Sequence, residues 1–112
     1  MDGSEYCQVV TTTDAREAAE RLAEGAVAAR LAACAKVSGP ITSSYWWEGA
    51  VTTDQEWQVV FKTTAAAYPA LERHLRAAHA YDVPEILCLP VATGNPAYLR
   101  WLDTEIQPGE HR

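Results

Sequence analysis

A long two-stranded pattern at residues 34–64 constrains the fold of this chain more than any other feature of its sequence. Its side chains alternate with a period of two, it contains no helical signal, and its two arms meet at residues 48–49. Each arm can reach about 13 residues, or about 43 Å, whereas a compact domain of this chain length is only about 35 Å across. The pattern therefore predicts a β-hairpin that is longer than the body of its domain.

The tip of this hairpin predicts self-association. It carries the aromatic residues Tyr45, Trp46 and Trp47, and although Gly39 and Pro40 can bend the first arm, the second arm has no such residue. Protruding aromatic strands tend to aggregate unless another chain covers them. We therefore predict an obligate homo-oligomer.

The remaining sequence predicts two more strands and three helices. Asp14 and Glu17 fit a capping box at the start of a first helix, whose alanine-rich face recurs every three or four residues until about Ala33. Asn95 and Pro96 form the cap and first-turn proline that are typical of a helix start. The two strands are predicted at residues 6–11 and 85–91, and the other two helices at residues 68–79 and 95–106.

The order of these elements is β-α-β-β-α-β with an extra C-terminal helix. It predicts an α+β, ferredoxin-like sandwich, in which two helices cover one face of a four-stranded antiparallel sheet. Pro90 indicates that the last strand lies at an edge of the sheet or contains a bulge. Because 112 residues leave no room for a second core, we expect residues 1–112 to form a single domain.

Charge and cysteine content restrict the partners and the location. Fifteen acidic and nine basic residues give a formal charge of -6, the wrong sign for holding a nucleic-acid backbone or an anionic membrane. Cys7, Cys34 and Cys88 are odd in number and form no C-x-x-C pair, as expected of buried thiols in a reducing compartment. The sequence shows neither a signal peptide nor an apolar run long enough to cross a bilayer. We therefore expect a cytoplasmic protein without nucleic-acid or membrane partners.

The densest group of functional side chains lies at residues 79–85, at a junction between a helix and a strand. His79, Tyr81, Asp82 and Glu85 offer an imidazole, a phenol and two carboxylates. Imidazole nitrogens and carboxylate oxygens suit divalent ions such as Cu, Zn and Ni. The spacing matches no closed metal motif, and the alternative is a histidine favoured by the helix dipole and followed by an acidic loop.

A second group of candidates lies on the hairpin. Trp46, Glu48 and Lys62 either form part of a binding site, or serve as interface packing and as a Glu–Lys cross-strand pair. Trp47 is assigned to interface packing. Cys34 is either a soft ligand for Cu(I) or a buried small hydrophobic residue.

The motifs of several enzyme classes are missing from the sequence. It has no G-x-S-x-G, no H-E-x-x-H, no P-loop and no G-x-G-x-x-G. An anion cradle of the acylphosphatase type would need a free asparagine, and the only asparagine, Asn95, is committed to capping a helix. The sequence therefore predicts a protein that is not an enzyme.

Four ordered blocks carry a family resemblance. The runs SYWWEG at residues 44–49, FKTT at 61–64, HAYDVPEI at 79–86 and GNPAYLRWL at 94–102 closely resemble the CutA family of divalent-cation tolerance proteins. The resemblance implies a ferredoxin-like subunit that assembles as a tight homotrimer through its long hairpins. It also implies a link to copper and other divalent cations.

The third block departs from the family pattern at two positions. Ala80 replaces a proline and Asp82 replaces a glutamate, whereas His79, Tyr81 and Glu85 match. A ligand role for Asp82 is therefore in doubt. The resemblance implies that the matching three residues, with Trp46, Glu48 and Lys62, line an inter-subunit cleft.

Two functions follow from this resemblance. In the first, a cytoplasmic trimer binds a divalent metal ion, chiefly copper, in clefts between subunits, with His79 and Glu85 as ligands and with Tyr81 and Lys62 shaping the site. However, the Lys62 ammonium repels a cation unless a carboxylate pairs with it. In the second function, the chain is therefore a signalling or scaffold module similar to the trimeric PII regulators, which binds a small anionic ligand or a protein partner.

Overall fold

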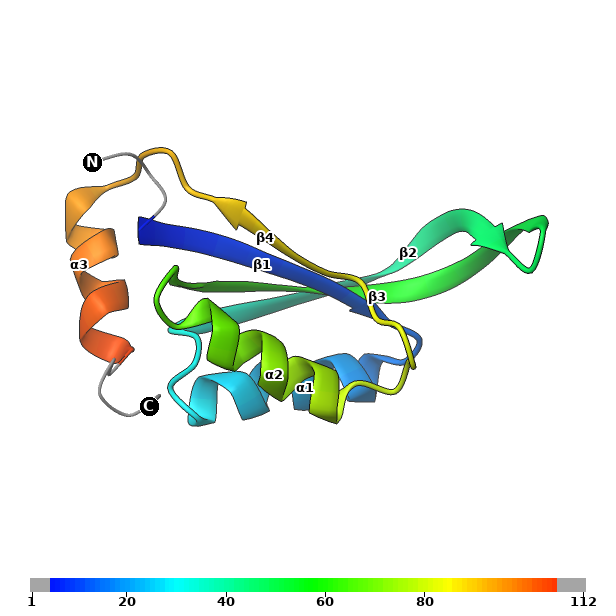
Figure 1. The fold of residues 1–112 in the computed structure, drawn as a ribbon, viewed down its shortest axis with the longest axis horizontal. Coiled ribbons are helices and arrows are strands. Elements are labelled where there is room, and N and C mark those ends of the chain that lie inside the picture. Colours follow the sequence, from blue (N-terminus) through cyan, green and yellow to red (C-terminus); the bar gives the residue numbers. More distant parts are fainter. Residues whose placement is uncertain (1–4, 107–112) are drawn as a thin grey trace.

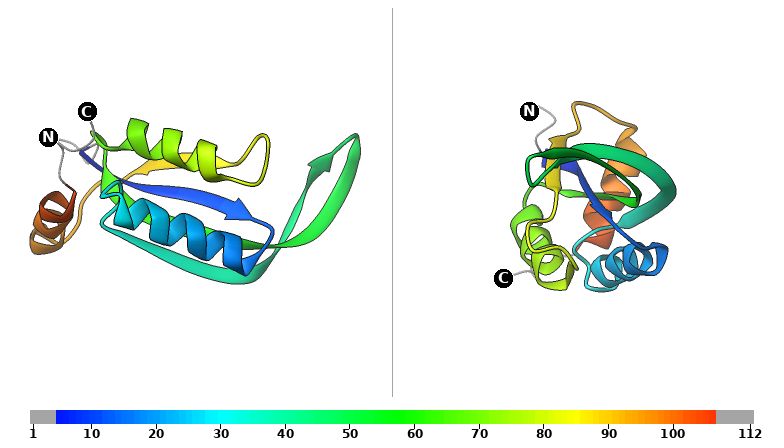
Figure 2. Two further views of the ribbon diagram at one scale, coloured as in Figure 1. Left: turned by 90° about the horizontal axis from the view of Figure 1, so that it is seen from below. Right: turned by 90° about the vertical axis from the view of Figure 1, so that its right-hand side faces the viewer.

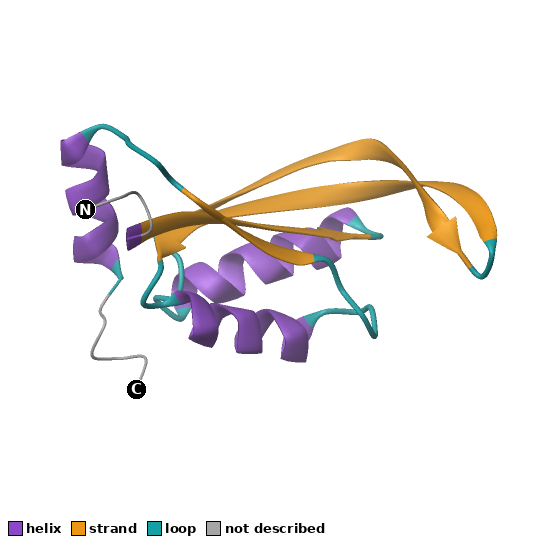
Figure 3. Ribbon diagram, turned by 45° about the horizontal axis from the view of Figure 1, so that its top comes forward, coloured by secondary structure: helices purple, strands orange, loops and turns teal. Residues whose placement is uncertain are grey.

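The computed structural model describes residues 5–106 and confirms the predicted α+β, ferredoxin-like fold (Figure 1). Four antiparallel strands form one sheet in the order β2-β3-β1-β4. Two helices, α1 and α2, lie side by side on one face of this sheet, whereas α3 lies beyond its end (Figures 2 and 3). The elements are β1 (Tyr6–Thr13), α1 (Arg16–Ala28), β2 (Cys34–Trp47), β3 (Ala50–Thr64), α2 (Tyr68–Ala78), β4 (Ile86–Pro90) and α3 (Pro96–Glu105).

The core lies between the sheet and the two helices that cover it. Val9 of β1 pairs with Phe61 of β3, and both side chains are fully buried. The alternation of a strand sends Val10, the next residue of β1, to the opposite face, which no helix covers. The small residues Ala19 and Ala26 are also fully buried and let α1 approach the sheet closely. One face of the sheet is therefore closed and the other is open.

The hairpin has the predicted length. β2 and β3 pair from Cys34 and Lys62 to Trp47 and Ala50, and the molecule measures 43 × 25 × 21 Å. The tip projects beyond the helices (Figure 1), and its side chains Trp46 and Trp47 are 75% and 61% exposed. The prediction of a ribbon that is longer than the body is thus confirmed.

The predicted bend of the first hairpin arm coincides with an irregularity. The register between β2 and β3 shifts between Ser38 and Ile41, and Gly39 has a φ of +148°. The backbone of Gly39 runs so close to Trp57 that a Cβ atom there would lie 2.6 Å from the indole Cδ1. Only glycine fits this position without strain.

Two predictions for α1 are wrong. The helix ends at Ala28 rather than near Ala33, because Arg30 takes a left-handed conformation with a φ of 62°. The N–H groups of Arg30 and Leu31 then donate to the last carbonyls of the helix, and the Arg30 guanidinium pairs with Glu105 at 2.8 Å. At the other end the cap is Ala15, without a side-chain hydrogen bond, instead of Asp14.

The other element predictions are confirmed. Helix α2 and strand β4 lie within the predicted residues, and β4 is an edge strand, as Pro90 indicated. Asn95 caps α3 by accepting a hydrogen bond from the Ala97 N–H at 3.0 Å.

The hairpin turn predicts a stabilising substitution. Its two residues, Glu48 and Gly49, both have positive φ, 49° and 79°, a conformation that asparagine adopts more readily than glutamate. We expect Glu48→Asn to raise the free energy of unfolding by about 0.5–1 kcal/mol. Urea denaturation measures the change, and an unaltered or lower midpoint would contradict it.

Candidate functional site beside the end of helix α2

The loop that joins α2 to β4 lies at the end of strand β1. Helix α2 ends at Ala78, and His79 caps it: the His79 N–H donates to the Leu75 carbonyl, and the His79 backbone is already extended. Strand β4 pairs with β1 only as far as Ile86 and Thr11, so the carbonyl of Thr12 lies beyond the last pair of this ladder. Beyond this pair, side chains of the loop take over the hydrogen bonding to β1 that β4 provides elsewhere.

Both ring nitrogens of His79 are occupied by hydrogen bonds. The Nε2 atom lies 2.9 Å from the Thr12 carbonyl oxygen, and the Nδ1 atom accepts a hydrogen bond from the Tyr81 N–H at 3.0 Å. Because a carbonyl oxygen can only accept, the hydrogen-bond pattern places the proton of a neutral ring on Nε2. His79 thus joins the end of β1 to its own loop.

Tyr81 connects the loop to the hairpin. Its hydroxyl donates to Oε2 of Glu56 on β3 at 2.8 Å, and its ring centroid lies 4.9 Å from that of His79. Burial, followed by this hydrogen bond to a carboxylate, raises the pKa of Tyr81 well above its usual value. Tyr81 therefore stays a neutral donor that holds the carboxylate of Glu56.

Glu85 reaches the same end of β1 from the other side of the loop. Its carbonyl accepts a hydrogen bond from the Thr11 hydroxyl at 2.6 Å, which fixes its backbone. Its Oε1 atom lies 3.5 Å from the Thr12 hydroxyl, a long contact, and the residue as a whole is exposed. The Glu85 carboxylate thus has oxygen lone pairs available to a cation.

Three of the predicted site residues therefore meet around Thr12, and three others do not. Lys62 of β3 pairs with Gln8 of β1. Gln8 precedes Thr12 by four residues, which places the pair about 13 Å from Thr12 along the strand. Trp46 and Glu48 lie still farther away, at the hairpin tip. Because Glu48 and Lys62 are at opposite ends of the hairpin, the alternative of a cross-strand pair between them is wrong.

The cysteines differ from one another in exposure. Cys7 is buried, Cys34 is half-buried and Cys88 is exposed, so the expectation of buried thiols is confirmed only for Cys7. The Cys34 sulfur lies 3.5 Å from the hydroxyl of Tyr98 on α3, far from the loop after α2. Cys34 therefore contributes no donor to the residues around Thr12.

The residues present fit a metal ion only in part. Within residues 5–106, no cluster of three or more His, Cys, Asp or Glu side chains is placed to hold a metal. Around Thr12 the carboxylate of Glu85 is available, whereas the His79 imidazole is already bonded at both nitrogens. A single copy of this chain thus offers an incomplete ligand set.

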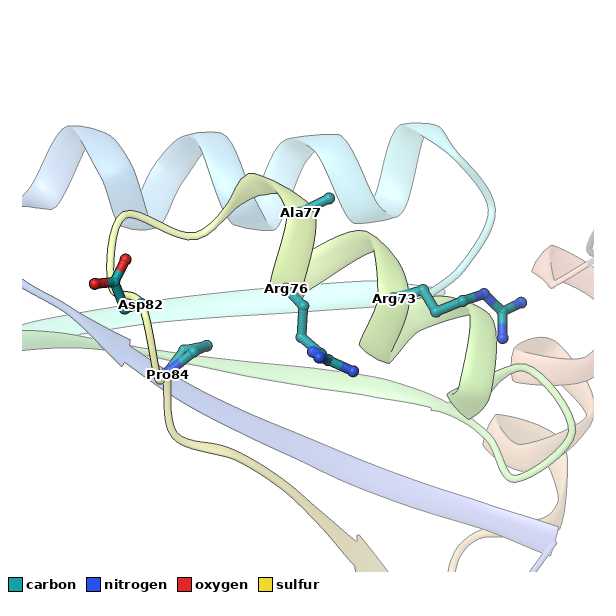
Figure 4. Close-up of a pocket in the computed structure, with 5 residues that line it drawn as sticks. All are labelled: Arg73, Arg76, Ala77, Asp82 and Pro84. Carbon is teal, nitrogen blue, oxygen red and sulfur yellow. The ribbon is translucent and has the colours of Figure 1, made fainter.

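A shallow hollow of about 340 Å³ borders the same loop (Figure 4). Its walls include Arg73 and Arg76, one turn apart on α2, with Asp82 and Pro84 from the loop. The only ion pair among residues 5–106 joins Arg30 to Glu105, so neither arginine of the hollow pairs with Asp82. The hollow therefore presents two guanidinium groups to solvent.

Sequence reasoning missed several residues of this region. Thr12 and Glu56 hold His79 and Tyr81, although they lie 67 and 25 residues away from them in the chain. No pattern in the sequence predicts these partners. The spacing of Arg73 and Arg76 on one helix does place both side chains on the same face and was an available signal.

Comparison with known proteins relates this geometry to a family. The family model described as CutA1 divalent ion tolerance protein matches residues 7–105. The divalent-cation tolerance protein CutA of Thermus thermophilus is 45% identical over 94 residues, which cover 84% of this chain and 91% of that protein. The chloroplastic protein CutA 1 of Oryza sativa subsp. japonica is also 45% identical over 94 residues and 84% of this chain, but the chain spans only 53% of its length.

Solved structures agree with the sequence comparison. CutA from Xylella fastidiosa superposes with a TM-score of 0.90 at 36% identity, over 93% of this chain and all of that one. None of the helices in the described part of the chain is both long and apolar enough to span a bilayer. From the family match, the identities and the shared fold together, we conclude that this chain belongs to the CutA1 family of divalent ion tolerance proteins.

Proposed function

We propose that this chain is a divalent-cation tolerance protein that works as a homotrimer and binds copper or another divalent cation in clefts between its subunits. The observation that carries the proposal is the meeting of His79, Tyr81 and Glu85 around Thr12. These residues lie at the edge of the sheet, where β4 has ended and the backbone of β1 continues, so a neighbouring copy that packs against this edge would enclose them. The ligand set that one copy leaves incomplete would then be completed by donors from the next.

The exposed apolar surface supports the trimer. On the open face, Val10 of β1 lies between Val60 of β3 and Leu87 of β4, and Leu87 and Leu89 are 54% and 42% exposed. Exposure of such an apolar surface to water is unfavourable in free energy, and the same holds for the exposed tryptophans at the hairpin tip. Packing of hairpins and open faces against other copies would bury both surfaces. It would also bring Trp46, Glu48 and Lys62 to the cleft.

The donor types favour a borderline metal ion. A carboxylate from Glu85 with an imidazole from His79 suits Cu(II), Zn(II) or Ni(II) better than it suits soft or hard ions. For His79 to act as a ligand, its Nδ1 atom must release the Tyr81 N–H. Tyr81 and Glu56 would remain joined and keep the loop in place.

A calorimetric titration of the assembled protein with Cu(II) and with Zn(II) tests this function. We expect Glu85→Gln to weaken binding at least about tenfold, because the amide loses the negative charge that attracts the cation. Glu20→Gln, which alters an exposed carboxylate on α1, is the matched control and should bind as the unmodified chain does. Equal affinities for all three proteins, or a monomer at micromolar concentration in ultracentrifugation, would refute the proposal.

One observation favours the second function, binding of a small anion by a module similar to PII. Arg73 and Arg76 present unpaired guanidinium groups at a hollow next to the loop, in a chain whose net charge is -6. Guanidinium groups bind phosphate and carboxylate in two-point fashion. Titration with inorganic phosphate decides: binding that is lost in the Arg73→Ala/Arg76→Ala variant, or in Lys62→Ala, without any uptake of metal, would replace the first function by the second.

The proposed role is binding without catalysis. We propose a cytoplasmic location, and the free thiols support it because thiols persist in reducing compartments. The rice relative is named as chloroplastic, and a solved structure from Archaeoglobus fulgidus is named as periplasmic.

A further inference from the structure

Two of the three cysteines lie on neighbouring strands at the edge of the sheet. In the ladder between β1 and β4, Cys88 is the direct partner of Val9, and Cys7 precedes Val9 by two residues. Cys7 and Cys88 are therefore diagonal neighbours on the face that the helices cover. The Cα atoms of diagonal neighbours in an antiparallel pair are about 7–8 Å apart and their Cβ atoms are somewhat closer, so one metal ion can lie between two cysteine sulfurs at such positions.

The two thiols differ in their access to solvent. Cys7 is 2% exposed and belongs to the core, whereas Cys88 lies on the edge strand and is exposed. Burial, followed by the nearby thiol of Cys88, raises the pKa of Cys7 to about 12. Tyr68, the first residue of α2, packs against the core cluster that contains Cys7. The pair thus has one sulfur in the core and one open to solvent.

The surroundings of the pair exclude most metal ions. Zn(II) requires four donors, and neither thiol belongs to a cluster of three or more His, Cys, Asp or Glu side chains within residues 5–106. Cu(I) is soft, prefers sulfur, and as a d¹⁰ ion is satisfied by two thiolates in a nearly linear arrangement. Of the common metal ions, Cu(I) alone therefore matches both the kind and the number of donors.

We propose that Cys7 and Cys88 form a binding site for one Cu(I) ion, separate from the residues around Thr12. On binding, two S–H bonds break and two Cu–S bonds form, so that two neutral thiols and one Cu(I) yield a bis-thiolate complex of charge -1 and two protons. No electron is transferred. The ion enters from the side of Cys88, and binding strengthens as the pH rises, because both protons must leave.

Cys34 provides a matched control for this site. It is a further accessible thiol of the same chain, but its neighbour is the neutral hydroxyl of Tyr98 rather than a second sulfur. A site that needs two thiols should therefore be insensitive to Cys34→Ser. Nonspecific binding of Cu(I) to any accessible thiol would instead decrease in Cys34→Ser.

The test is an anaerobic competition for Cu(I) against the chromogenic chelator bathocuproine disulfonate, with the thiols kept reduced by a phosphine. We expect the unmodified chain and Cys34→Ser to take up one Cu(I) per chain. Cys88→Ser and Cys7→Ser should each lose at least about a hundredfold in affinity, because a single thiolate remains. Glu85→Gln should bind Cu(I) normally, which separates this site from the proposed divalent site.

Three outcomes would overturn the site. They are a lack of Cu(I) uptake by the unmodified chain, undiminished uptake by Cys7→Ser, and a loss in Cys34→Ser as large as that in Cys88→Ser. Circular dichroism shows whether Cys7→Ser, a change in the core, keeps its fold. If it does not, the exposed position of Cys88 makes Cys88→Ser the deciding variant, and undiminished uptake by it also refutes the pair.

Discussion

Replacement of Gly39 by alanine is expected to lower the free energy of unfolding by about 2–4 kcal/mol. A Cβ atom at this position would lie 2.6 Å from Cδ1 and 2.9 Å from Cγ of Trp57, and 3.0 Å from the carbonyl oxygen of Glu56. The φ of +148° adds backbone strain for any residue with a side chain. The indole or the backbone must shift, and either movement disturbs the irregular pairing between β2 and β3.

Urea denaturation of Gly39→Ala measures this loss, and Gly94→Ala is its matched control. At Gly94 an added Cβ would meet only the Leu99 side chain, at 3.5 Å or more, which is ordinary contact. We expect this second substitution to change stability by less than about 1 kcal/mol. If both substitutions change the free energy of unfolding equally, the close approach of Gly39 to Trp57 does not contribute to stability.

The local parts of the fold could be predicted from the sequence because their signals lie within a few residues. Alternation predicted the hairpin, and Asn95 with Pro96 predicted the start of α3. The end of α1 could not be predicted in this way. Arg30 occupies a left-handed position at which glycine is the usual signal, and a contact with Glu105, 75 residues away, helps to hold it there.

The candidate site likewise contains residues that local sequence predicts and residues that only the tertiary fold brings in. His79, Tyr81 and Glu85 are close in sequence, so a search for chemically active residues finds them together. Their partners Thr12 and Glu56 come from two strands whose positions only the tertiary fold defines. Within one copy, Trp46, Glu48 and Lys62 lie far from these three residues, so a shared site is part of the proposed trimer and not of the single subunit.

Substitution of His79 by alanine is expected to lower the free energy of unfolding by about 2–3 kcal/mol. The carbonyl of Thr12, a buried residue, would lose its donor, and the Tyr81 N–H would lose its acceptor. His74→Ala is the control, because His74 lies on α2, is half-buried and makes no hydrogen bond through its side chain among residues 5–106. If both substitutions reduce stability equally, the two hydrogen bonds of His79 contribute little.

The same two bonds give a direct test of whether His79 binds metal. A cation can reach Nδ1 only after the Tyr81 N–H has left it, whereas Nε2 is held by the Thr12 carbonyl. Coordination should therefore free the Tyr81 amide, and we expect its hydrogen exchange to become at least about tenfold faster when Cu(II) is added. Exchange that is unchanged while Cu(II) binds would mean that His79 only fastens the loop to β1. Glu85 would then be the sole donor that this loop supplies, and every other ligand of the cation would have to come from elsewhere in the assembly.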